Sequence, residues 1–156
     1  MNHNKWWSLV PILAAGLFLL VVNEKASAVD SSVVGTVQKA GGTVNIVRQG
    51  ETMNAKVGLE LWQNDTLRTG PDGSVGVLFK DDTSLSLGPD SALVIDEFVF
   101  APHQGKFSIV VKMLKGTAVY ISGLASRFEP DSTRFETPSA SLGIRGTKFV
   151  VKVEEK

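Results

Sequence analysis

Hydrophobic and polar residues alternate with a period of two along most of the chain after residue 28. This alternation is typical of β-strands that bury one face, and no segment there shows a convincing helical period. We therefore expect an all-β domain whose odd-numbered apolar residues share a face. Leu78, Val110 and Val150 interrupt the alternation, which indicates strands covered on both faces. The regular positions are Val75, Val77, Phe79, Leu85, Leu87, Leu93, Ile95, Phe107, Ile109, Val111, Met113, Val119, Ile121, Phe149, Val151 and Val153.

Glycine, proline and aspartate mark the turns between these strands. The run Gly70-Pro71-Asp72-Gly73 is typical of a type I or II turn, since proline fixes φ and glycine accepts the strained position. Gly41-Gly42 separates strands expected over Val33–Gln38 and Thr43–Arg48, and paired glycines favour a tight hairpin. Turn signals at spacings of about 8–12 residues predict a single domain of short strands. This spacing is typical of a sandwich, a barrel or a solenoid, and we expect a solenoid-like or sandwich-like architecture.

The first 28 residues predict a signal peptide. Lys5 supplies a positive start, and the apolar run Leu9–Val22 is shorter than the roughly 20 residues that a membrane-spanning helix needs. Ala26 and Ala28 form the A-x-A pattern that signal peptidase accepts, so we expect cleavage after Ala28 and a β domain over 29–156. The expected location is periplasmic or secreted, with no stable membrane insertion after cleavage. An uncleaved anchor is the open alternative.

Charge and cysteine content exclude several classes of function. The full chain has 16 Lys and Arg against 16 Asp and Glu, and removal of Lys5, Lys25 and Glu24 leaves 14 basic and 15 acidic residues. Binding to a phosphate backbone needs a basic surface, so nucleic acid is not an expected partner. The chain has no cysteine, so it folds by packing alone and offers no thiol or zinc–cysteine chemistry.

Residue patterns that carry catalysis are missing after residue 28. His103 is the single histidine there, beside Pro102 in an expected loop, and no G-x-S-x-G nucleophile turn occurs. The acids Asp72, Asp81, Asp82, Asp90, Asp96 and Glu97 do not match a calcium-binding loop and fall mostly at turns. We therefore expect no enzyme activity, no metal and no cofactor.

Two stretches are candidates for structural or partner contacts. Asp65, which precedes Arg68 in a polar strand entrance, is expected either to accept hydrogen bonds from backbone amides or to lie in a solvated turn. Gly143 and Gly146 flank Ile144-Arg145, and a buried Ile144 would point Arg145 to the opposite side. Gly146 is expected to mark a bulge. Two roles for Arg145 stay open, a structural ion pair with a carboxylate such as Asp65 or Glu136 and an anchor for an anionic group on a partner.

One segment departs from the strand rhythm. Ser122–Ser139 contains Glu129-Pro130-Asp131 and Thr137-Pro138, and connects two expected strands by a long detour. Long loops in compact domains are often functional or disordered. The alternative is a surface excursion held by Phe128 and Phe135.

The same stretches carry a resemblance to a known family. Asp65–Gly70 with Gly73-Ser74-Val75, then Asp81–Leu85, Leu87-Gly88-Pro89 and Leu114-Lys115-Gly116, resemble the FecR-like domain. So does the closing run Phe135–Pro138 with Ile144-Arg145-Gly146-Thr147-Lys148-Phe149, which is the most specific part. Asp82 stands where the family typically has a turn glycine. The resemblance covers roughly Val57 to Val153 and implies a twisted, solenoid-like all-β domain.

The family is named after a regulator of bacterial surface signalling, and its full regulators carry further segments. Only eight residues precede Leu9 and the chain stops at Lys156, so we expect the extracytoplasmic module alone. The expected function is a non-catalytic binding or scaffolding module of the bacterial envelope. Its expected partner is an envelope protein or a cell-wall polymer. A sensory module that relays an envelope or metal signal to a membrane partner is the alternative.

Overall fold

The computed structural model describes residues 33–146 and 148–154. The predicted leader and its cleavage residues, Ala26 and Ala28, lie outside the described residues, so cleavage stays a prediction. The strands are β1 (Val33–Gly41), β2 (Val44–Arg48), β3 (Glu51–Asn54), β4 (Glu60–Trp62), β5 (Thr66–Thr69), β6 (Ser74–Phe79), β7 (Ser84–Leu87), β8 (Ala92–Ala101), β9 (Lys106–Ile121), β10 (Thr133–Glu136), β11 (Ser141–Gly143) and β12 (Lys148–Val153). Two single turns of helix, η1 (Pro102–Gln104) and α1 (Ala125–Phe128), complete the described elements.

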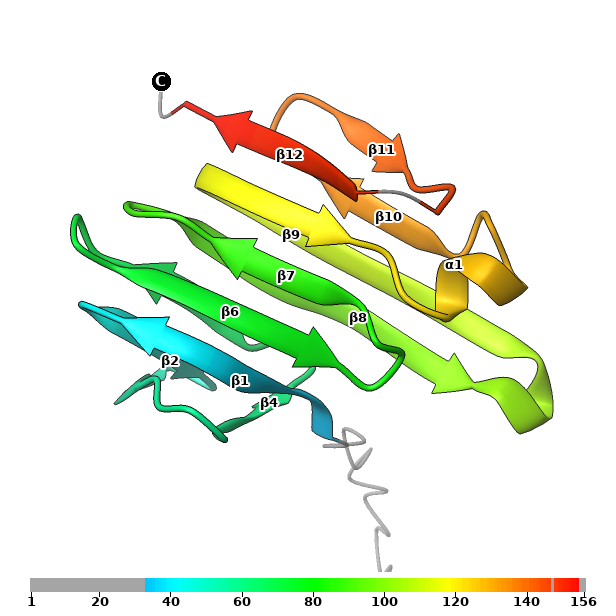
Figure 1. Ribbon diagram of the computed structural model, residues 1–156, viewed down its shortest axis with the longest axis horizontal. Helices are drawn as coiled ribbons and strands as arrows, with labels where there is room; N and C mark the ends of the chain where they lie inside the picture. Colours follow the sequence, from blue (N-terminus) through cyan, green and yellow to red (C-terminus); the bar gives the residue numbers. More distant parts are fainter. Residues whose placement is uncertain (1–32, 147, 155–156) are drawn as a thin grey trace, which may run out of the picture.

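The strands form two facing layers that share one strand (Figure 1). The front sheet has the order β4-β1-β6-β7-β9-β12, and the back sheet has the order β3-β2-β5-β8-β9-β10-β11. All neighbouring strands are antiparallel except β9 and β10, which are parallel. The all-β single domain is therefore confirmed, and of the two expected architectures the sandwich-like one is found, curled into a half-barrel.

The long strand β9 changes sheet near its middle. Its first part pairs with β8 in the back sheet, and its second part pairs with β7 and β12 in the front sheet. Ala92 lies opposite Lys115 while Leu93 lies opposite Met113, so Leu114 is an extra, bulged residue. Gly116 follows with a φ of +94°, a left-handed conformation that glycine adopts without steric cost.

This bulge reverses which residues of β9 are buried. Ile109, Val111 and Met113 face the core, but beyond the bulge the core positions are Ala118 and Tyr120. The expectation that Ile121 continues the buried face is therefore wrong, and its side chain is 42% exposed. One extra residue exchanges the two faces of a strand because side chains alternate with a period of two.

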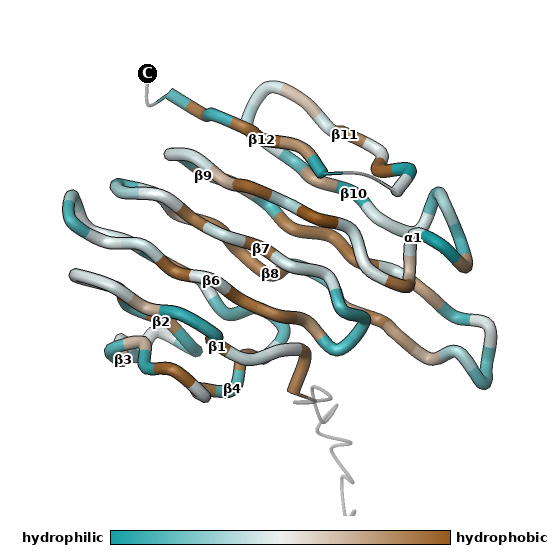
Figure 2. Tube along the Cα trace, viewed as in Figure 1, coloured by the Kyte–Doolittle hydropathy of each residue, from teal (hydrophilic) through white to brown (hydrophobic). Residues whose placement is uncertain are grey.

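Elsewhere the buried face follows the sequence pattern closely. Val75, Val77 and Phe79 of β6 are buried, as are Leu85 and Leu87 of β7 and Leu93 and Ile95 of β8. Hydrophobic residues fill the middle of the strands and hydrophilic ones gather at the turns (Figure 2). Of the residues that interrupt the alternation, Val110 is buried as predicted, whereas Leu78 and Val150 are exposed.

The expected hairpin at Gly41-Gly42 is wrong. β1 pairs with β4 and β6 in the front sheet, and β2 pairs with β3 and β5 in the back sheet, so the chain crosses between layers there. Gly42 has a φ of +63°, and a Cβ on it would lie 2.1 Å from the Asp72 carbonyl oxygen. The backbone N–H of Thr43 donates to the Asp72 carboxylate at 3.2 Å. The two glycines therefore let the chain pass close to the Gly70–Gly73 turn as it crosses from the front sheet to the back sheet.

Gly116→Ala tests how far the fold depends on the change of sheet in β9. A Cβ at Gly116 would lie 2.1 Å from Ser91 Oγ and 2.5 Å from Ser91 Cα. We expect a loss of more than about 3 kcal/mol in the free energy of unfolding, measured by urea denaturation. Gly105→Ala is the matched control, because Gly105 also has a left-handed φ but has open space around it. Its expected loss is about 1 kcal/mol, and equal losses in the two variants would contradict the steric argument.

Candidate partner-binding surface

Asp65 lies in a buried ion pair at one side of the sandwich. Its carboxylate is fully buried and accepts two hydrogen bonds from Arg48, at 2.8 and 2.7 Å. The backbone N–H of Trp62 donates to the same carboxylate at 2.8 Å, as the sequence predicted for backbone amides. The Arg48 guanidinium lies 4.0 Å from the centre of the Trp62 ring. The hydrogen bonds from Arg48 to Asp65 raise the pKa of Arg48, so this group stays charged and joins β2 to the β4–β5 turn.

The structure pairs both acids proposed for Arg145 with other cations. Asp65 binds Arg48, and Glu136 lies 3.8 Å from Lys112, which also pairs with Asp96 at 2.8 Å. The expected ion pair of Arg145 with Asp65 or Glu136 is therefore wrong. Ile144 is buried and Arg145 is exposed, so the predicted opposite orientation of these two residues is confirmed.

The other candidate residues are spread over the fold. Gly146 lies in the turn between β11 and β12 with a φ of +46°, and it precedes the β12–β9 ladder instead of forming a bulge in it. Thr147 lies outside the described residues. Arg68 is exposed on β5 opposite Ala92, at the end of the back sheet where β9 changes layer.

A second buried carboxylate fixes the chain after β9. Asp81, in the β6–β7 turn, is fully buried and accepts hydrogen bonds from the Thr83 backbone and hydroxyl and from the Ala125 amide, at 2.8 to 3.4 Å. Its backbone carbonyl accepts a further bond from Leu124 at 2.6 Å. Asp82 takes the left-handed conformation of the turn, with a φ of +65°. The position where the family has glycine therefore keeps the turn, because aspartate tolerates this region.

The Ser122–Ser139 segment is an integral part of the fold. It forms α1 and then β10, which pairs in parallel with β9, and the Ile109 amide donates to the Ser132 carbonyl. Phe135 is fully buried and meets Tyr120 and Phe149 with ring centroids 6.0 and 5.5 Å apart. Burial raises the pKa of Tyr120, which keeps its hydroxyl neutral inside this cluster. Of the two residues expected to hold this segment in place, Phe135 therefore attaches it to the core.

The other expected pinning residue, Phe128, lies at the surface. It is 63% exposed and stacks on Phe107 at 5.5 Å, and Phe107 in turn meets Phe100 at 5.8 Å. These rings come from α1, β9 and β8, so three elements form one aromatic patch. Large exposed apolar side chains held in place by such stacking are features of interaction sites.

Three exposed arginines belong to elements at the same end of the sandwich. Arg127 belongs to α1, Arg134 to β10, and Arg145 to the turn after β11, which is held by the Ile144 amide donating to the Thr133 carbonyl. Figure 1 shows α1 and the β11–β12 turn at one end of the layers. We call Phe107, Arg127, Phe128, Arg134 and Arg145 the α1-end surface. Aromatic residues and arginine are the types most enriched at protein interfaces.

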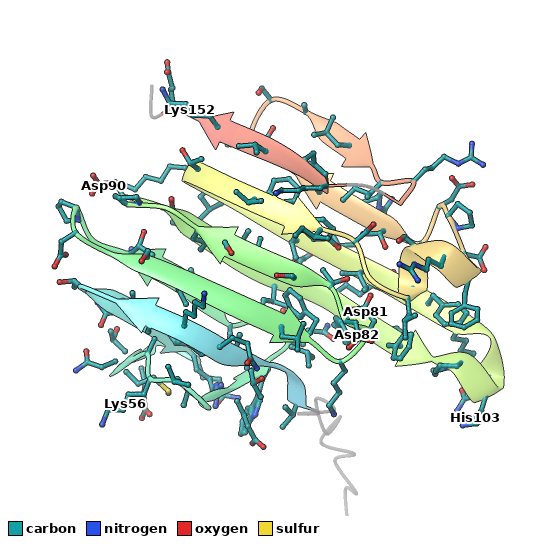
Figure 3. The ribbon with its side chains drawn as sticks, viewed as in Figure 1. Lys56, Asp81, Asp82, Asp90, His103 and Lys152 are labelled. Carbon is teal, nitrogen blue, oxygen red and sulfur yellow. The ribbon has the colours of Figure 1, made fainter. Side chains whose placement is uncertain are left out.

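The residues considered for chemistry lie apart from one another. His103 is exposed at the tip of the β8–β9 hairpin, as predicted, while Asp81 and Asp82 lie at the β6–β7 turn and Asp90 at the opposite end (Figure 3). Within residues 33–146 and 148–154, no three His, Cys, Asp or Glu side chains gather in a metal-binding arrangement. None of the described helices has the length and hydrophobicity to span a membrane.

The described residues form an all-β, two-layer domain with two buried carboxylates and an end that exposes aromatic and arginine side chains. A comparison with family models matches residues 65–156 to the FecR protein family, which is more than half of the chain. The chain belongs to the FecR family, a family of regulatory and sensory proteins. Curated proteins and solved structures give no significant match. β1 and β2, which precede the matched part, pair with β6 and β5 and complete the two sheets.

Asp65→Ala tests the structural assignment of the buried carboxylate. The substitution leaves Arg48, whose side chain is only 16% exposed, without its charge partner. Removal of one member of a buried pair costs about 3–5 kcal/mol, so we expect a loss of that size in thermal or chemical denaturation. Asp96→Ala removes an exposed ion pair with Lys112 and is expected to cost less than about 1 kcal/mol. A cost as small for Asp65→Ala would mean that the carboxylate does not stabilise the fold.

Proposed function

We propose that this protein is a non-catalytic, extracytoplasmic module that binds an envelope protein or a cell-wall polymer through the α1-end surface. The observation that carries the proposal is Phe128, a large apolar side chain that is 63% exposed on a rigid support. Its support is the buried Asp81 network, which holds the residues before α1 by hydrogen bonds at 2.6 to 3.4 Å. A surface organised before binding loses little conformational entropy when the partner arrives.

Charge on the α1-end surface favours a partner that carries anionic or hydrogen-bond-accepting groups. The surface carries Arg127, Arg134 and Arg145, and the acids Glu129 and Asp131 line one hollow together with Arg134. A guanidinium beside an aromatic ring can bind a carboxylate or phosphate while the ring packs against apolar groups. Envelope proteins and cell-wall polymers both offer such combinations.

Membership of the FecR family favours a second candidate function. The family is associated with signalling at the bacterial envelope, which supports a module that relays an envelope or metal signal to a membrane partner. Both candidates use the same kind of binding surface and differ in the identity of the partner. Co-purification of a membrane receptor would favour the sensory role, whereas capture of a polymer would favour scaffolding.

Phe128→Ala is the principal test. Capture from the native envelope, with the purified protein as bait, is expected to fall at least about tenfold, the effect of losing one strong interface residue. The free energy of unfolding is expected to change by no more than about 1 kcal/mol, because only an exposed stacking contact is lost. Val57→Ala is the matched control, since Val57 is 68% exposed on the side of the fold closed by the β3–β4 loop. Unchanged capture by the Phe128 variant would refute this surface.

Arg145→Ala tests the polar part of the surface. We expect weaker capture with unchanged thermal stability, because the guanidinium is exposed. Arg68→Ala is the comparison variant, since Arg68 is also exposed but lies at the opposite end of the back sheet. A large drop in the stability of the Arg145 variant would show that the arginine has a structural role instead. Deletion of Ser122–Ser139 is unsuitable, because it would remove the buried Phe135.

A further inference from the structure

The sandwich is closed on one side and open on the other. On the closed side, the loop between β3 and β4 bonds to both sheets, through Ala55 to the Val44 carbonyl and through Gly58 to the Val37 carbonyl. On the open side, β12 ends the front sheet and β11 ends the back sheet (Figure 1). Two hollows of about 620 and 280 Å³ lie between these edge strands, and both are lined by Leu142 and Val151.

Among the edge strands of the described residues, β12 is the one suited to further pairing. It has six residues, against four in β3 and three each in β4 and β11. Its register with β9 is unbroken from Lys148 to Val153, and it contains neither proline nor glycine. Natural edge strands are protected against further pairing by short length, bulges, proline or charged side chains. Of these protections, β12 has only the charged side chains.

The two faces of β12 restrict how it can pair. Phe149, Val151 and Val153 turn toward the core and are only partly covered, while Lys148, Val150 and Lys152 are exposed on the other face, and the exposed Glu154 directly follows the strand. When two copies of a strand pair antiparallel about a two-fold axis, opposite residues must point to the same face. Odd residues must therefore oppose odd residues, and even residues must oppose even ones, which leaves three registers of useful length.

Charge selects one of these three registers. Centring the pair on Val150 places Lys148 opposite Lys152 twice, and centring it on Lys152 places that lysine opposite its own copy. Centring it on Val151 instead places Lys148 opposite Glu154 twice, Phe149 opposite Val153 twice, and Val151 opposite itself. Opposite charges and apolar pairs directly across antiparallel strands are stabilising, while like charges are destabilising. Lys152 lies opposite Val150 in this register and pairs with Glu154 of its own chain at 3.0 Å, so this is the register of the three in which no two lysines oppose each other.

We propose that β12 binds a second copy of this chain, antiparallel and centred on Val151, so that the front sheets of two molecules become one continuous sheet. The two-fold axis runs perpendicular to the sheet, so both back sheets lie on the same side. The half-covered Phe149, Val151 and Val153 of each molecule then cover those of the other. This interface uses the β12 edge, whereas the α1-end surface is centred on Phe128; Arg145 lines the smaller hollow beside β12 and lies between the two. Neither proposal depends on the other.

Charge reversal at Lys148 and Glu154 tests the proposal. The measurement is sedimentation equilibrium from micromolar to millimolar concentration, on the protein in the form in which its host produces it. The natural chain is expected to form dimers. Lys148→Glu and Glu154→Lys each oppose like charges twice, so each is expected to weaken the dimer at least about tenfold. An equimolar mixture of the two variants restores both attractive pairs in a heterodimer, and the variant that carries both substitutions restores the homodimer. Lys106→Glu, at the distant start of β9, is the control and should leave dimerisation unchanged.

Cysteine trapping tests the register itself, because the natural chain has no cysteine. Val151→Cys places two thiols directly opposite each other, within the Cα distance of about 4.4–6.8 Å that a disulfide requires. Added oxidised glutathione should join them, with its own disulfide reduced in exchange. Val150→Cys is the control, since its copies would be diagonal neighbours about 7–8 Å apart. A natural chain that is monomeric throughout would overturn the proposal, as would failure of the mixed variants to associate or equal trapping at both positions.

Discussion

The change of sheet in β9 is the constraint on which the rest of the structure depends. One bulged residue, Leu114, and one left-handed glycine, Gly116, allow a single strand to serve the back sheet and then the front sheet. Backbone hydrogen bonds of one continuous strand therefore connect both layers, and the core forms between them. The strands that pair with β9 from either side, β7, β8, β10 and β12, all take their position from this bend.

Buried charge has a structural task in this protein. Asp65 joins β2 to the β4–β5 turn through Arg48, and Asp81 holds the start of α1 through backbone amides. Each carboxylate has enough hydrogen-bond donors around it to offset part of the cost of leaving water. The segment that Asp81 holds continues into α1, where the ring of Phe128 is exposed.

The α1 end of the sandwich and its β12 edge differ in the groups that they expose. The α1-end surface combines aromatic rings with arginines, whereas the β12 edge offers a backbone ladder with one favourable register of charges. A dimer through β12 would carry two α1-end surfaces on one assembly. Two linked binding surfaces raise the avidity for a repetitive target without any new contact, provided that both can reach it.

The sequence by itself determined the all-β class, the buried face of β6, β7 and β8, and the turns at Gly70–Gly73 and Asp81-Asp82, because period-two patterning and turn chemistry act between near neighbours. It also offered backbone amides as one of two environments for Asp65, and it predicted that Arg145 points away from a buried Ile144. It did not reveal Arg48 as the partner of Asp65, the crossing at Gly41-Gly42, or the exchange of buried faces at Leu114. Each of these depends on residues far apart in the chain, and only the packing of two sheets decides which of them meet.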